Sequence, residues 1–126
     1  MKKIILKAKI NFKSELNLKN LSKINFEEKI ISKIKMLYDN KEFKLKELFK
    51  IQVKKSDKNE LIIFGTNRNC DYLGWKWKKG TLRIKSDVGS FLGVQMINGK
   101  IIVEGSCEHH VGSGMTGGKI FIKSDA

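Results

Sequence analysis

The stretch LRIKSDVGSFLGVQMINGK, residues 82–100, decides the fold, because its pattern is repeated along the second half of the chain. It is preceded by IFGTNRNCDYLGWKWKKGT (63–81) and followed by IIVEGSCEHHVGSGMTGGK (101–119) and the partial repeat IFIKSDA (120–126). Two columns of glycines keep a spacing of nineteen residues: Gly74, Gly93 and Gly112, and Gly80, Gly99 and Gly118. A fixed period of about 20 residues indicates a repeat architecture, and each unit is too short for a pair of helices.

Each repeat opens with an alternating segment and closes on glycine, which is typical of a strand and a tight turn. In residues 82–85, Leu82 and Ile84 point one way and the two basic side chains the other. Stacked repeats would form four inner rows: Ile63/Leu82/Ile101/Ile120, Ile84/Val103/Ile122, Leu73/Leu92/Val111 and Trp77/Met96/Met115. We therefore expect a mainly β protein with a short right-handed parallel β-helix of about three turns over residues 59–126. The six repeated glycines would be structural residues at its corners.

Residues 1–58 are expected to form a separate, small α+β module in front of the repeats. Residues 3–12 alternate like a half-buried strand, and residues 26–34 carry an apolar face at helical spacing. Residues 36–45 have the pattern of a hairpin around the turn 39–41. The charged segment Lys54–Glu60 is the expected boundary.

The outward side chains of the repeats contain apolar residues that need a cover. At the nineteen-residue spacing, Phe64, Arg83, Ile102 and Phe121 share one outward column. Either the N-terminal module folds back over this column or the column meets another subunit. The last apolar strand, with Ile120 and Ile122, would leave an open edge that promotes association, end-to-end self-association included. The candidate interface is therefore Phe64, Ile102, Phe121, Ile120 and Ile122.

Composition sets limits on function. The net charge is +13, and residues 1–60 hold 17 Lys and Arg against 8 Asp and Glu. This charge raises the question of nucleic acid, and a basic module that binds nucleic acid through its Lys-rich N-terminal half and Trp75 is the alternative function. A solvated surface or an acidic protein partner fits better. No apolar run approaches a membrane span, and two cysteines give no disulfide framework, so we expect a cytoplasmic protein.

Cys107-Glu108-His109-His110 is the densest cluster of chemically active residues. Zinc takes Cys and His ligands, so a free-standing metal protein with ligands at Cys107, His109 and His110 is a third possibility. Adjacent histidines on an extended segment point in opposite directions, however, which argues against a shared metal. No nucleophile, base and orienting group emerge together. We expect no catalytic, cofactor-binding or metal-binding residue in this chain, and a simple stack of Tyr72, Phe91 and His110.

Three stretches of the repeats resemble the glycine-repeat subunit of formylmethanofuran dehydrogenase, its C subunit: residues 85–93 (KSDVGSFLG), 96–105 (MINGKIIVEG) and 115–120 (MTGGKI). The related C-terminal domain of the glutamate synthase large subunit has similar repeats. The opening MKKIILKAK and residues 36–49 also look like the N-terminal module of the formylmethanofuran dehydrogenase subunit, a module that glutamate synthase has no reason to supply. We therefore favour the formylmethanofuran dehydrogenase subunit.

The resemblance implies a noncatalytic scaffold inside a cytoplasmic oxidoreductase complex that reduces carbon dioxide onto methanofuran in methanogenesis. It equally implies the related bacterial complex that transfers and hydrolyses the formyl group. In both, other subunits carry the chemistry, with molybdopterin holding tungsten or molybdenum, iron–sulfur clusters, or a metallohydrolase centre. The implied partners are molybdopterin-binding and amidohydrolase-like subunits, and no cofactor is implied in this chain.

Overall fold

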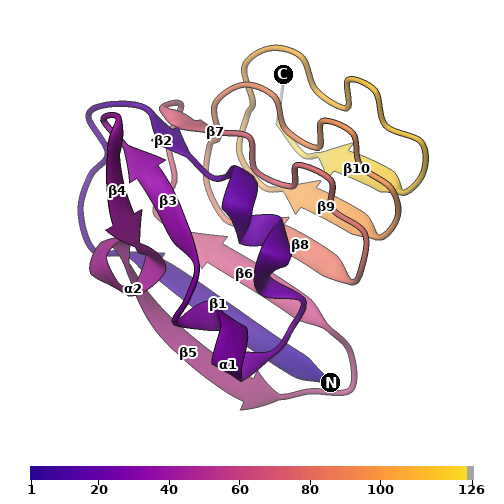
Figure 1. The fold of residues 1–126 in the computed structure, drawn as a ribbon. Coiled ribbons are helices and arrows are strands. Elements are labelled where there is room, and N and C mark those ends of the chain that lie inside the picture. Colours follow the sequence, from indigo (N-terminus) through magenta and orange to yellow (C-terminus); the bar gives the residue numbers. More distant parts are fainter. Residues whose placement is uncertain (125–126) are drawn as a thin grey trace.

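The computed structural model describes residues 1–124 and contains two mixed β-sheets (Figure 1). The strands are β1 (Lys2–Ala8), β2 (Leu16–Asn17), β3 (Lys35–Tyr38), β4 (Lys41–Lys44), β5 (Phe49–Lys55), β6 (Glu60–Phe64), β7 (Cys70–Asp71), β8 (Thr81–Ile84), β9 (Lys100–Val103) and β10 (Lys119–Ile122). The helical segments are the 3-10 helix η1 (Lys19–Ile24) and the single turns α1 (Glu28–Ile31) and α2 (Leu45–Leu48). The six-stranded sheet has the order β10-β9-β8-β6-β1-β5, and the four-stranded sheet has the order β4-β3-β2-β7.

The predicted fold class, a short parallel β-helix preceded by a separate α+β module, is wrong. The N-terminal strands are built into the same sheets as the repeats: β1 pairs parallel with β6 and antiparallel with β5, and β2 pairs parallel with β7. Periodicity could not reveal this arrangement, because β1 and β5 lie outside the repeats and pair with them only in three dimensions. The domain boundary expected between residues 58 and 59 stays a prediction.

The repeat strands β6, β8, β9 and β10 are parallel neighbours, each one repeat further along the chain. All six repeated glycines have a positive φ, between 66° and 86°. The repeats are closely packed at these points: a Cβ on Gly99 would lie 2.6 Å from the carbonyl oxygen of Gly80, and one on Gly93 would lie 2.6 Å from the Cδ1 of Ile120. The structural role expected of these glycines stays a prediction, which a substitution at Gly99 would test.

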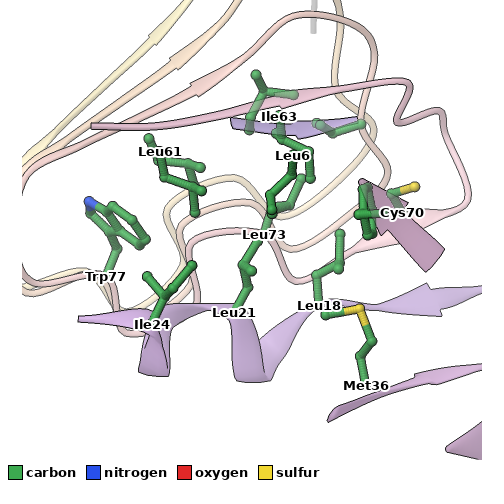
Figure 2. Close-up of a cluster of buried hydrophobic side chains, with 14 of the residues drawn as sticks. Leu6, Leu18, Leu21, Ile24, Met36, Leu61, Ile63, Cys70, Leu73 and Trp77 are labelled. Carbon is green, nitrogen blue, oxygen red and sulfur yellow. The ribbon is translucent and has the colours of Figure 1, made fainter. Parts of the chain in front are cut away.

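The core lies between the six-stranded sheet and the segments packed on its inner face (Figures 1 and 2). Ile4 and Leu6 of β1 pair with Leu61 and Ile63 of β6, and all four side chains are completely buried. Opposite them lie buried side chains of η1 and of the first repeat, among them Leu21, Ile24, Leu73 and Trp77. The inner face of β1 thus continues the inner face of the repeats.

The hairpin expected at residues 36–45 is confirmed by the antiparallel pair β3 and β4. Asp39 and Asn40 between these strands both have positive φ, which a tight two-residue hairpin turn requires and which Asn and Asp tolerate. The helix expected at 26–34 shrinks to the four residues of α1, and residues 13–24, for which no element was expected, hold β2 and η1. Short elements here are held by burial rather than by intrinsic propensity.

Candidate interaction surface

The outer face of the six-stranded sheet, the face turned away from the core, carries a row of side chains across five strands that is apolar except for one arginine. Pairing places Ile5, Ile62, Arg83, Ile102 and Phe121 side by side, and Gln52 of β5 ends the row. The three isoleucines are half-buried, and Phe121 is 48% exposed. Among residues 1–124, no helix or strand covers this face (Figure 1). We call this set the apolar row.

The register differs from the nineteen-residue spacing at the first repeat. Thr81 pairs with Lys100, and Lys100 with Lys119, nineteen residues apart, whereas Glu60 pairs with Thr81, twenty-one residues apart. The residue opposite Arg83 is therefore Ile62 and not Phe64. Likewise Leu61, not Ile63, lies beside Leu82. A shift of two keeps each side chain on its face, so the division into inner and outer residues is unaffected.

Phe64 lies in the row next to the apolar row, where its neighbour on β1 is Lys7. It is 36% exposed, and the Lys7 ammonium lies 5.7 Å from the centre of its ring. One of the two expectations was that the N-terminal module folds back over Phe64, Ile102 and Phe121. The structure shows that it does not. It extends the sheet sideways instead, and adds the half-buried Ile5 to the apolar residues of the outer face.

Ile5 and Ile62 are the residues of this surface that sequence reasoning missed. Both are isoleucines at outward positions of their strands. The alternation of side chains along each strand was the signal that could have identified them. The neighbours of Ile5 across the sheet could not be known before the pairing of β1 with β6.

Two rows of charged residues flank the apolar row. One row contains Lys54, Lys3, Glu60, Thr81, Lys100 and Lys119, and the other contains Lys50, Lys7, Phe64, Lys85, Glu104 and Lys123. Both carboxylates are engaged within this face. The Arg83 guanidinium lies 3.3 Å from Glu60 and 3.6 Å from Glu104, and the Lys85 ammonium lies 2.9 Å from Glu104. The hydrogen bond from Lys85 keeps the pKa of Glu104 below its usual range.

Ile120 and Ile122 lie on the inner side of β10, at one end of the six-stranded sheet. Both are half-buried and line a depression with Val111, Gly112 and Met115. The assignment of Ile120, Ile122, Phe64, Ile102 and Phe121 to an interface stays a prediction. What covers the chain at Ala126 lies outside the described residues.

The cluster at residues 107–110 is dispersed in the structure. Cys107 is buried, whereas His109 and His110 are exposed and their ring centres lie 6.4 Å apart. Within residues 1–124, no three His, Cys, Asp or Glu side chains gather in an arrangement that could hold a metal ion. His110 stacks on Phe91, which stacks on Tyr72, at ring separations of 5.1 and 4.7 Å and interplanar angles of 8°. The expected stack is thus present.

Trp77 and Trp75 have different environments, as the repeat pattern indicates. Trp77 is buried and its indole N–H donates to the carbonyl oxygen of Gly80 at 3.0 Å. Trp75 is half-exposed between two ammonium groups, with Lys19 5.3 Å and Lys76 4.7 Å from the ring centre. Lys19 also lies 4.4 Å from the centre of the Tyr72 ring. Each of these ammonium groups lies over a ring on which a base would stack.

The fold defines a repeat-containing, mainly β protein, and its candidate site is the outer face of the six-stranded sheet. Within residues 1–124, no helix is long and apolar enough to span a membrane. No family model matches the chain, and no curated protein matches it.

Among solved structures, the chain is similar to a chain in the X-ray crystal structure of the formyltransferase/hydrolase complex (FhcABCD) from Methylorubrum extorquens in complex with methylofuran. The two share 29% sequence identity with a TM-score of 0.78, over 94% of this chain and 45% of that chain. This protein is thus related in sequence and fold to a component of a formyltransferase/hydrolase complex, and it spans less than half of that component's length.

Proposed function

We propose that this protein is a noncatalytic scaffold in a cytoplasmic complex related to formylmethanofuran dehydrogenase or to the bacterial formyltransferase/hydrolase complex, where it takes the place of the glycine-repeat subunit. The observation that carries this proposal is the similarity over 94% of the chain to one component of such a complex. The apolar row adds to it, because its half-buried isoleucines and the 48% exposed Phe121 lie on a sheet face that no other described element covers, and exposed apolar patches often mark contact sites.

The chemistry of the complex would then belong to its other subunits. Molybdopterin with tungsten or molybdenum, iron–sulfur clusters and a metallohydrolase centre would be held by the partners, and carbon dioxide reduction in methanogenesis or formyl transfer would take place there. This chain would contribute Phe64, Ile102 and Phe121 on its outer face, and Ile120 and Ile122 at the end of the sheet, to contacts with those partners.

Affinity purification of the tagged, full-length protein from the cells that naturally produce it, followed by mass spectrometry, tests the proposal. Molybdopterin-binding and amidohydrolase-like subunits should be recovered in fixed proportion to this chain. Phe121→Ser should remove them while the far-ultraviolet circular dichroism is unchanged. Leu37→Ser is the matched control, because Leu37 of β3 is 45% exposed but belongs to the other sheet. Recovery of the protein without either kind of subunit would contradict the proposal.

A further inference from the structure

The outer face of the six-stranded sheet has the layout of a protein interface. Its centre is the apolar row, with Ile5, Ile62 and Ile102 half-buried, and both margins are charged. An apolar centre surrounded by a polar rim is the usual anatomy of protein–protein contacts. The lysines at the margins are longer than the isoleucines between them and, apart from the half-buried Lys3, they are exposed. The row therefore forms the floor of a shallow groove, and its partner has to present a ridge.

The charge of the rim indicates the charge of the partner. Among residues 1–124, nine basic side chains stand on this face against two carboxylates: Lys3, Lys7, Lys50, Lys54, Arg83, Lys85, Lys100, Lys119 and Lys123, against Glu60 and Glu104. Within this described part of the chain, Glu60 and Glu104 pair with Arg83 and Lys85, and the other lysines of the two margins form no ion pair. An acidic surface is complementary to them, and complementary charge speeds association and excludes wrong partners.

A second copy of this chain does not fit this face. Two copies meeting face to face would bring lysine-rich margins together across a surface of low dielectric constant, where like charges opposite one another cost several kcal/mol. Self-association through the outer face is therefore disfavoured. This argument does not apply to end-to-end association at β10.

Nucleic acid and membrane fit it less well than protein. The centre of the face offers isoleucine side chains, which neither hydrogen-bond to base edges nor stack on bases, and its one arginine is already paired with Glu60. An anionic membrane needs apolar side chains that protrude beyond the charged ones, whereas here they lie between them. Phe121, at the end of the row, is the one ring of the apolar row that is exposed to a large extent.

We propose that the outer face of the six-stranded sheet binds an acidic protein partner that presents an apolar ridge flanked on both sides by carboxylates. The ridge packs on Ile5, Ile62, Ile102 and Phe121, and its carboxylates pair with the lysines of the two margins. This inference deepens the proposed function by giving the chemistry of the contact, and it rests on that proposal only for the identity of the partner.

Zero-length cross-linking tests the inference, because a carbodiimide joins an ammonium group directly to a carboxylate in contact with it. The full-length protein is treated with the reagent in extract of its source cells, and cross-linked peptides are identified by mass spectrometry. Links should connect Lys100, Lys119 or Lys123 to Asp or Glu residues of a partner. Lys100→Glu/Lys119→Glu should reduce the recovered partner at least tenfold at low salt. Lys41→Glu/Lys78→Glu, with the same change of charge at exposed positions outside this face, should leave it unchanged.

Three results would overturn the inference. The first is a partner that is cross-linked only through lysines outside the outer face, or that the Lys100/Lys119 variant retains. The second is the absence of any cross-linked protein at these lysines. The third is equally salt-sensitive binding of single-stranded DNA or of phosphatidylglycerol vesicles that the same variant abolishes. If the cross-linked partner belongs to another kind of complex, the proposed function fails and the inference stands. If formyltransferase-type subunits bind to another surface of this chain, the proposed function stands and the inference fails.

Discussion

The guanidinium of Arg83 lies 3.3 Å from the carboxylate of Glu60, and the Glu60 side chain is only 5% exposed. This pair joins β8 to β6 on the outer face and connects the middle of the apolar row to one of its charged margins. Arg83 also reaches Glu104 on β9 at 3.6 Å, so one basic side chain ties three parallel strands together. A buried carboxylate is tolerated only while its partner remains.

Arg83→Met should therefore destabilise the protein, because it leaves Glu60 buried without its cation. We expect a loss of about 1–3 kcal/mol in the free energy of unfolding, somewhat less than for a fully buried pair, since Arg83 is partly exposed. Urea unfolding followed by circular dichroism measures it. The double variant Glu60→Gln/Arg83→Met should recover most of the loss. If the single variant is as stable as the double variant, Glu60 does not depend on Arg83.

Gly99→Ala should be one of the most damaging small substitutions in the repeats. Its φ is +86°, and a Cβ would lie 2.6 Å from the Gly80 carbonyl oxygen and 3.1 Å from the Trp77 ring. A left-handed backbone costs roughly 1–2 kcal/mol and overpacking costs roughly 1–3 kcal/mol, so we expect a loss of about 2–5 kcal/mol in unfolding experiments.

Gly114→Ala is the matched control, with φ +71° but with Gln95 Cγ as the nearest atom at 3.4 Å. Gly114→Ala should lower the free energy of unfolding only by the strain of the left-handed backbone, about 1–2 kcal/mol. Equal losses for the two variants would mean that close packing of successive repeats does not depend on Gly99.

Glu15→Gln should change how stability depends on pH. A hydrogen bond with the Asp71 carboxyl, helped by partial burial, raises the pKa of Glu15 above its ordinary value of 4.5. The folded protein thus holds this proton more tightly than the unfolded chain does. The stability that this proton contributes is complete below pH 4.5 and disappears as the pH rises through the higher pKa of the folded state.

The glutamine variant lacks this dependence. Thermal unfolding at several pH values should therefore show that the stability of the variant, relative to that of the natural protein, increases as the pH rises above about 4.5. Glu28→Gln removes an exposed carboxylate of α1 and serves as the charge control. If the melting temperatures of Glu15→Gln and of the natural protein change with pH in parallel, Glu15 is not coupled to Asp71.

The thiol of Cys70 should be unreactive in the folded protein. Burial raises its pKa to about 11, and its side chain is almost completely enclosed. At pH 8 the thiolate fraction is then on the order of a hundredth of that of an ordinary thiol. In a Cys107→Ser background, modification by a disulfide reagent should be at least tenfold slower than in urea. Similar rates in both conditions would show that this end of the four-stranded sheet opens readily.

Much of the architecture of residues 61–124 follows from local pattern. Leu82 and Ile84 alternate with Arg83 and Lys85, and a period of two in a strand places such pairs on opposite faces wherever the strand is. Aromatic residues one repeat apart stack because the repeats stack, so the Tyr72, Phe91 and His110 series could be predicted without coordinates. These features depend on neighbours along the chain or one full repeat away.

Tertiary structure alone decided how the two halves of the chain combine. Ile5 lies beside Ile62 because β1 inserts between β5 and β6, and no periodic signal links residues 57 positions apart. The two additional residues between β6 and β8 moved Phe64 out of the row that its spacing predicted. The repeat sequence determined which side chains face outward, since that depends on strand alternation. Which of them form one continuous surface depended on long-range strand pairing, which hydrogen bonding and core packing select over the whole molecule.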